Sequence, residues 1–134
     1  MMMTLPLDAR DDDILAVVRA WAELLAEERY ADALAFVDHR EHWEPALLRT
    51  VIMSYGSPEP CEGHDHRVTP LALAGGELKP RHEVDRCDSN AGDRVGYVWF
   101  DLPLDGEWSD LTATFDIECR EGRLVLVLDD VHVM

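Results

Sequence analysis

Hydrophobic positions in the first third of the chain repeat every three or four residues. Between residues 14 and 25 they form one apolar stripe, which predicts an amphipathic helix. Three aspartates at 11–13 place negative charge at its amino end, where the helix dipole favours it. The same period predicts a second helix over 30–38 and a third over 43–56. The first stripe consists of Ile14, Val17, Val18, Trp21, Leu24 and Leu25.

The period changes to two in the last third of the chain. This pattern predicts antiparallel strands over 82–88, 94–102, 110–120 and 123–133, joined by glycine-containing turns. In the third strand apolar and polar residues alternate, so we expect one buried and one solvated face. Residues 124–128 are all apolar, so the fourth strand is expected to lie centrally and to be covered on both faces.

Residues 57–82 interrupt both patterns with four prolines and three glycines. An irregular stretch of this length is uncommon in a compact domain. Two interpretations stay open, a short strand over 66–73 or a functional loop, and we expect some of both.

Helices followed by a meandering sheet predict a single α+β domain over 1–134, with three N-terminal helices on a curved, mostly antiparallel sheet of four or five strands. The opening ILAVVRAWAELLAEERYADALAFV and the closing DLTATFDIECREGRLVLVLDDVHV resemble the NTF2-like (cystatin-like roll) superfamily. The closing stretch also resembles a group of small, uncharacterised stand-alone bacterial proteins. The resemblance implies helices packed into the cone of a bent sheet, although the irregular segment at 57–82 departs from that layout.

The charge of the chain narrows its possible partners. Asp and Glu total 28 against 12 Lys and Arg, which gives a formal net charge of −16. Such a surface repels phosphate backbones and anionic lipids, so we expect no nucleic acid and no membrane as partner. It attracts a basic protein, although acidity also simply keeps proteins in solution. An odd number of cysteines, three, favours reduced thiols and a cytoplasmic location.

A first candidate site combines cysteine and histidine around the irregular segment. Cys61 and His64 have the spacing C-x2-H, and His82 and Cys87 have the spacing H-x4-C. Four such ligands suit a structural zinc ion. The arrangement lacks the C-x2-C knuckle that makes zinc motifs specific. We therefore expect a polar loop without a cofactor and keep zinc as the alternative.

A second candidate site lies at the end of the fourth strand. By simple alternation, Asp130 and His132 share a face with Leu124, Leu126 and Leu128. A carboxylate–imidazole pair is a unit of proton transfer. Enzymes of the superfamily that this chain resembles carry Asp and His inside the cone. That resemblance implies a cone pocket with these two residues. Tyr97, Trp99 and Asp101 line the same pocket if the strand over 94–102 faces it. The other interpretation is a solvated strand end.

A third candidate is the polar face of the sheet. Trp108 is an aromatic anchor beside a row of carboxylates that includes Asp110, Asp116 and Glu118. Acidic surfaces with an aromatic anchor suit a basic protein partner. The other interpretation is a solvated face with one partly covered tryptophan.

Two function classes follow from these sites. The favoured one is a small acidic, non-enzymatic binding protein, such as an immunity-type inhibitor of a basic toxin or partner protein. The alternative is an NTF2-like small-molecule-binding domain or enzyme that uses Asp130 and His132. A fourth strand that is apolar on both faces needs cover on each. We expect a homodimer to supply it, and a partner protein is the alternative.

Overall fold

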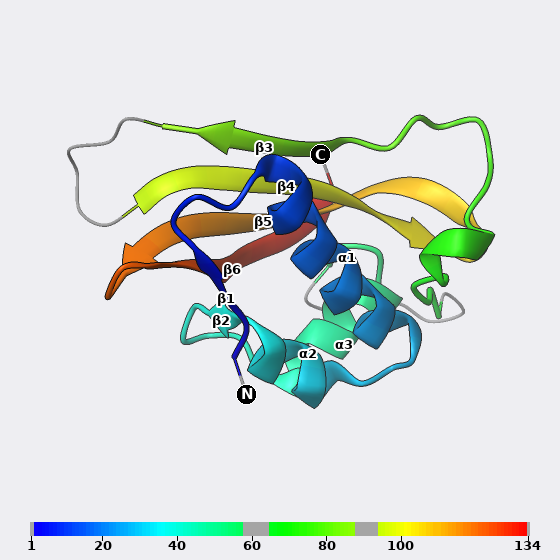
Figure 1. Cartoon of the computed structure of the whole chain (residues 1–134). Helices are drawn as coiled ribbons and strands as arrows, with labels where there is room; N and C mark the ends of the chain where they lie inside the picture. The colour runs from blue at the N-terminus through cyan, green and yellow to red at the C-terminus, as the bar shows by residue number, and fades with distance from the viewer. Residues whose placement is uncertain (1, 58–64, 88–93, 134) are drawn as a thin grey trace.

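The computed structural model describes residues 2–57, 65–87 and 94–133. Three helices pack against a curled, largely antiparallel sheet, and the predicted α+β class is confirmed (Figure 1). The helices are α1 (Asp11–Ala26), α2 (Tyr30–Phe36) and α3 (Pro45–Met53), with a 3-10 turn, η1 (Leu71–Leu73). The strands are β1 (Thr4–Pro6), β2 (Asp38–His39), β3 (His82–Arg86), β4 (Arg94–Leu104), β5 (Glu107–Arg120) and β6 (Arg123–Val133).

Local sequence determines where the helices begin and end. At the start of α1 the backbone N–H of Arg10 donates to the Asp13 carboxylate over 2.9 Å, which satisfies a backbone group beside the first turn. Pro45 opens α3, where its missing N–H costs nothing. Tyr55 and Gly56 follow α3 with positive φ, and the N–H of Gly56 returns to the Val51 carbonyl.

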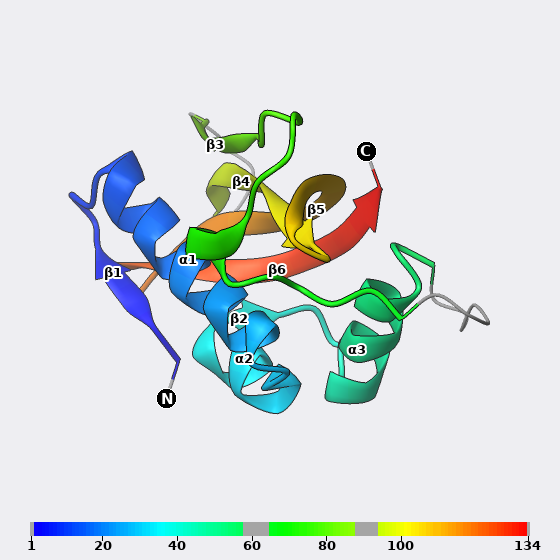
Figure 2. The same cartoon turned by 90° about the vertical axis from the view of Figure 1, so that its right-hand side faces the viewer.

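The sheet has the strand order β1-β6-β5-β4-β3, and β2 pairs in parallel with β6 beside β1. The prediction of four or five strands missed the two short ones, which add to the outer edge of β6. Figure 2 shows the sheet curling around the helices. Register shifts in the β4–β5 and β5–β6 pairings contribute to the curl, because a bulge bends the strand that carries it. Gly96 is required in β4, since a Cβ there would lie 2.5 Å from the Asp85 carbonyl oxygen.

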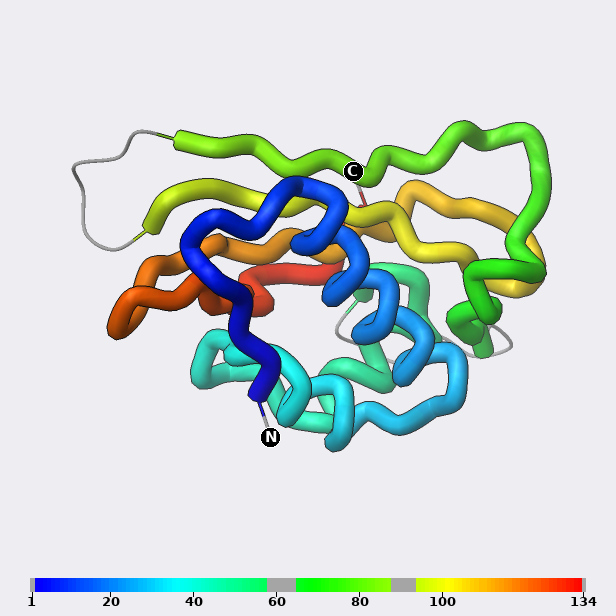
Figure 3. Tube along the Cα trace, viewed as in Figure 1, coloured from blue at the N-terminus to red at the C-terminus, as the bar shows by residue number. Residues whose placement is uncertain are grey.

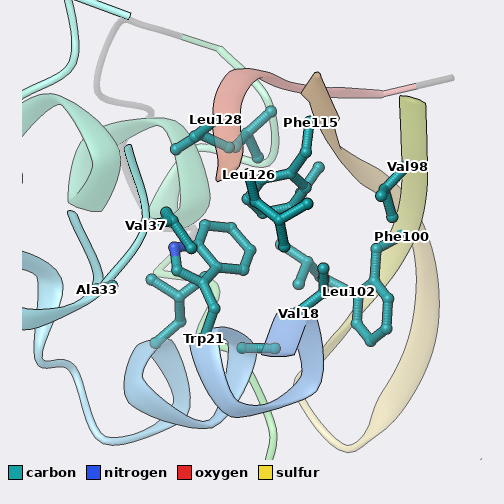
Figure 4. Packing of buried hydrophobic residues seen from close by; sticks show 14 of the residues in the cluster. Val18, Trp21, Ala33, Val37, Val98, Phe100, Leu102, Phe115, Leu126 and Leu128 are labelled. Atoms are coloured by element: carbon teal, nitrogen blue, oxygen red, sulfur yellow. The ribbon is translucent and has the colours of Figure 1, made fainter. Parts of the chain in front are cut away.

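The core lies between α1 and the concave face of the sheet. Trp21 from α1 meets Phe115 from β5 edge-to-face, with ring centroids 4.9 Å apart (Figure 4). Both side chains are fully buried, as is Phe100 on β4. Aromatic pairs of this kind contribute about 1 kcal/mol beyond their buried area.

Strand β6 lies inside the sheet, between β5 and the two short strands, as its apolar sequence predicted. Leu124, Leu126 and Leu128 face the core. Val125 and Val127 point to the outer face, yet they are only 3% and 1% exposed within one chain. Their burial therefore needs no second molecule, and the sequence argument for a homodimer loses its basis.

The segment 65–81 runs as an irregular strap beside the β4–β5 turn before it reaches β3 (Figure 3). The strand expected over 66–73 is absent. Val68 forms a single bridge to Leu104, and Pro70, which has no N–H to donate, ends the pairing before η1. The strap is fastened further on, where the Gly75 N–H donates to the Gly106 carbonyl and the Trp108 N–H donates to the Gly75 carbonyl, each over 3.0 Å.

Each helix in the described part of the chain is too short or too polar to cross a membrane.

Candidate functional site

The predicted zinc ligands are only partly within the described residues. Cys61 and His64 lie outside them. His82 begins β3 and Cys87 follows its last residue. An extended chain of that length spans roughly 16 Å, so these two side chains cannot bind one ion. The residues that the structure describes contain no group of three potential metal ligands.

His82 instead forms part of the packing at the sheet edge. Its ring stacks on Phe100 with centroids 3.8 Å apart and meets Trp108 at 5.1 Å. Its Nε2 lies 3.1 Å from the carbonyl oxygen of Asp101, which accepts a hydrogen bond from it. Burial lowers the pKa of His82, which favours the neutral ring at this position.

The Asp130–His132 pair lies on the opposite face from the one expected. Thr114 pairs with Asp130 and Phe115 pairs with Leu128, so Asp129 is an extra residue in β6. This bulge reverses the alternation, and Asp130 and His132 point away from the cone. The placement predicted for them inside a cone pocket is therefore wrong.

Contacts at Asp129 explain the bulge. The Trp43 indole N–H donates to the Asp129 carbonyl over 3.0 Å, and the Val131 N–H donates to the Asp130 carboxylate over 2.9 Å. Nδ1 of His132 lies 3.1 Å from the Asp130 carboxylate but has no hydrogen-bond geometry to it. The pair is adjacent without being aligned for proton transfer.

Tyr97, Trp99 and Asp101 are on this same outer face, where they pair with Asp116, Thr114 and Thr112 of β5. The structure brings them to the face that carries Asp130 and His132, but not into a cone pocket. Arg94 and Arg81 lie over the rings of Tyr97 and Trp99, at 4.5 and 4.6 Å from the centroids.

Asp101 is a structural carboxylate. Its two oxygens accept hydrogen bonds from the Arg81 N–H over 2.7 Å and from the Thr112 hydroxyl over 2.6 Å. Both Asp101 and Thr112 are buried, so this contact joins the sheet edge to β5 and leaves no acceptor directed at a ligand.

The predicted acidic face of β5 is divided between two environments. The first is a salt-bridge cluster around Asp116 and Glu118. Arg40 enters from the β2 connection, crosses β6 and binds Asp116, with Glu118 at 3.6 Å and Asp129 at 3.5 Å. Arg120 binds Glu118 over 2.7 Å and Asp38 over 2.5 Å.

The ion pairs with Arg40 and Arg120 cover part of the polar face of β5. Asp116 is only 7% exposed and Thr112 is fully buried, so the prediction of a solvated face is wrong for both. A buried carboxylate such as that of Asp116 is stabilised by the cation paired with it. Asp116 and Glu118 therefore take part in ion pairs within the fold.

The second environment is an open hollow beside the β4–β5 turn, with a volume of about 370 Å³. The strap, the end of α3 and the turn meet there. Trp108 and Asp110, both predicted for partner binding, line it. The complete lining consists of Tyr55, His66, Leu78, Leu104, Asp105, Glu107, Trp108, Ser109 and Asp110.

Hydrogen bonds fix two of the three carboxylates in the hollow. The Tyr55 hydroxyl donates to one oxygen of Asp110. Burial and this carboxylate raise the pKa of Tyr55, which keeps the hydroxyl protonated as a donor. Asp105 accepts the Arg67 N–H over 3.1 Å, and its other oxygen lies 2.6 Å from Nδ1 of His66.

The hollow keeps its negative charge. Among the described residues no donor reaches Glu107 or the second oxygen of Asp110, and neither Lys nor Arg lines the hollow. The guanidinium of Arg67 points to Glu28, 3.8 Å away. The three carboxylates can attract a cation, and the rings of Trp108 and Tyr55 can contact its apolar part.

Sequence reasoning identified Trp108 and Asp110 as partner-binding residues but did not connect Tyr55, His66 and Leu78 with them. These three lie on separate segments that the fold brings together. The Tyr55–Gly56 step at the end of the third predicted helix was a local signal, but it indicated only a helix end.

Comparison with protein families, with curated proteins and with solved structures gave no match. The NTF2-like resemblance of the sequence therefore stays a prediction.

Proposed function

We propose that this chain is a non-enzymatic binding protein whose partner presents positive charge to the hollow at the β4–β5 turn. The observation that carries the proposal is the composition of that hollow, in which Asp105, Glu107 and Asp110 surround Trp108 without any lysine or arginine. The net charge of −16 supports it, because the whole surface steers a cationic partner toward the protein.

The salt-bridge cluster supports the same assignment by contrast. Asp116 and Glu118 already bind arginines of their own chain, so they add little attraction for a partner. Within the part of the chain that the structure describes, no arginine or lysine lines the hollow with its carboxylates.

An immunity-type inhibitor of a basic toxin is the version that the charge favours, in an NTF2-like α+β fold and in the cytoplasm. The free thiols of Cys87 and Cys119 are compatible with a reducing compartment. A homodimer is a separate proposal that now lacks the support of an uncovered β6.

The test begins with isolation of the stoichiometric partner from the native host and native mass spectrometry of the complex. Association is then measured against salt with the isolated partner. We expect the rate constant to fall steeply with ionic strength. The double variant Glu107→Gln/Asp110→Asn is expected to associate about tenfold more slowly.

The matched control is Asp12→Asn/Glu41→Gln, which removes two exposed carboxylates outside the hollow. A partner without basic character, or an equal effect of both double variants, would show that the hollow is not the binding site.

A further inference from the structure

The walls of the hollow are held rigidly before any partner arrives. The His82 ring contacts the indole of Trp108, with ring centroids 5.1 Å apart. The backbone N–H of Trp108 donates to the Gly75 carbonyl. Tyr55 holds one oxygen of Asp110 and contacts the His66 ring with centroids 5.1 Å apart. An aromatic surface fixed in this way loses little entropy when it binds a side chain.

The hollow offers carboxylate oxygens to the N–H groups of a cation. The second oxygen of Asp110 and both oxygens of Glu107 have no donor among the described residues, and these residues stand on either side of Trp108 in β5. A guanidinium has several N–H groups in a flat fork and also stacks on aromatic rings. An ammonium is a compact, strongly hydrated point charge that uses such a site less well.

The rim of the hollow adds an apolar contact. Leu78 lines the hollow and is 47% exposed, and Leu73 on the same strap is 72% exposed. The strap is fastened to the β4–β5 turn through Gly75. Leu78 is therefore held as an apolar lip beside the anionic hollow.

We infer that the hollow accepts an arginine side chain of the partner, and that an aliphatic residue next to this arginine packs on Leu78. The inference rests on the proposed function and names the partner's contact residues. The guanidinium binds Glu107 and Asp110 and lies against Trp108. The aliphatic neighbour then covers the exposed leucine.

The test uses blocked dipeptides as probes on the isotopically labelled full chain. Acetyl-Arg-Leu-amide, acetyl-Lys-Leu-amide and acetyl-Arg-Gly-amide are titrated at low salt. The backbone amide resonances of residues 107–110 are followed by NMR, together with the Trp108 indole resonance in every chain that retains it. We expect the Arg-Leu probe to bind about fivefold more tightly than the Lys-Leu probe. Trp108→Leu is expected to remove this preference, whereas the control Trp99→Leu on the outer face keeps it.

Leu78→Ser changes an exposed side chain and leaves the charges in place. In this variant the Arg-Leu and Arg-Gly probes are expected to bind equally well. An unchanged advantage of Arg-Leu would overturn the role of Leu78.

The outcomes separate this inference from the proposed function. Equal binding of the arginine and lysine probes, or no shift at Trp108 with any probe, would overturn the assignment of arginine. The proposed function would still stand if Glu107→Gln/Asp110→Asn slows association with the partner. It fails when that variant associates like the control pair.

Discussion

Two groups of carboxylates on or beside β5 have the same chemistry and opposite surroundings. Asp116 and Glu118 bind Arg40 and Arg120, and Asp116 is buried. Around the hollow, Glu107 has no cation partner within the described residues and Asp110 has only a neutral donor, Tyr55. The first group holds the molecule together, and the second leaves its charge available to another molecule. An acidic count alone does not distinguish these roles.

Removal of Arg40 is the strongest way to test the comparison. Arg40→Ala leaves the buried Asp116 without its main cation, and an uncompensated buried charge is destabilising. Since Arg40 is partly exposed, we expect a loss of about 2 kcal/mol in the free energy of unfolding, measured with urea. The control Arg49→Ala removes the same charge from the exposed face of α3 and should cost less than about 0.5 kcal/mol. Equal losses would mean that the cluster contributes nothing specific.

Acid sensitivity should also arise in the salt-bridge cluster. Burial alone would raise the pKa of Asp38, but hydrogen bonds from Arg120 and from the His39 N–H outweigh it and lower the pKa below 3.8. The unfolded chain therefore takes up this proton first as the pH falls. The stabilisation is complete above about pH 4 and is lost as the pH drops through the lowered pKa.

Asp38→Asn removes the titrating group. Urea unfolding at several pH values should give a flatter decline in stability below pH 4 for this variant than for the natural chain. Asp8→Asn, at an exposed position, is the control and should keep the natural profile. A parallel decline in the Asp38 variant would contradict the prediction.

A smaller effect is expected at the wall of the hollow. Tyr55→Phe removes the hydroxyl that donates to Asp110. Because Asp110 is exposed and water can replace the donor, the free energy of unfolding should fall by about 0.5–1 kcal/mol. Tyr97→Phe on the outer face tests whether any tyrosine hydroxyl has this effect, and we expect a smaller change there.

The smallest effect is predicted for Glu107→Gln. This carboxylate is exposed and has no described partner, so its neutralisation should change the free energy of unfolding by less than about 0.5 kcal/mol. The same urea measurement applies. A loss as large as that of Arg40→Ala would show that Glu107 supports the fold and would remove the contrast between the two groups.

The long elements could be predicted from sequence because their periods are local. The stripe around Trp21 became α1, and the apolar run at 124–128 became the interior of β6. The bulge in β6 has no such local pattern in the sequence. Asp129 looks like one more residue of an alternating strand. The groups that contact it in the bulge, the Trp43 indole and the Arg40 guanidinium, are distant in sequence.

The candidate site was less accessible to sequence reasoning. Asp116 fits a solvated face until β2 pairs with β6 and brings Arg40 to it, from 76 positions away. Trp108 and Asp110 were identified because aromatic and acidic residues are conspicuous. Their neighbours Tyr55 and Leu78 are ordinary residues on other segments, and long-range folding alone places them in the hollow.

The pairing of β1 with β6 has a consequence for how the molecule is made. The Arg123 side chain donates to Thr4, 119 positions away in the chain. Among the described elements, β2 has β6 as its only strand partner. A ribosome releases residues 4–6 and 38–39 long before residues 123–133. The sheet therefore closes after β6 has emerged, and closure of so long a loop slows the final step of folding. During synthesis, Arg40 therefore emerges before Asp116, the buried carboxylate with which it pairs.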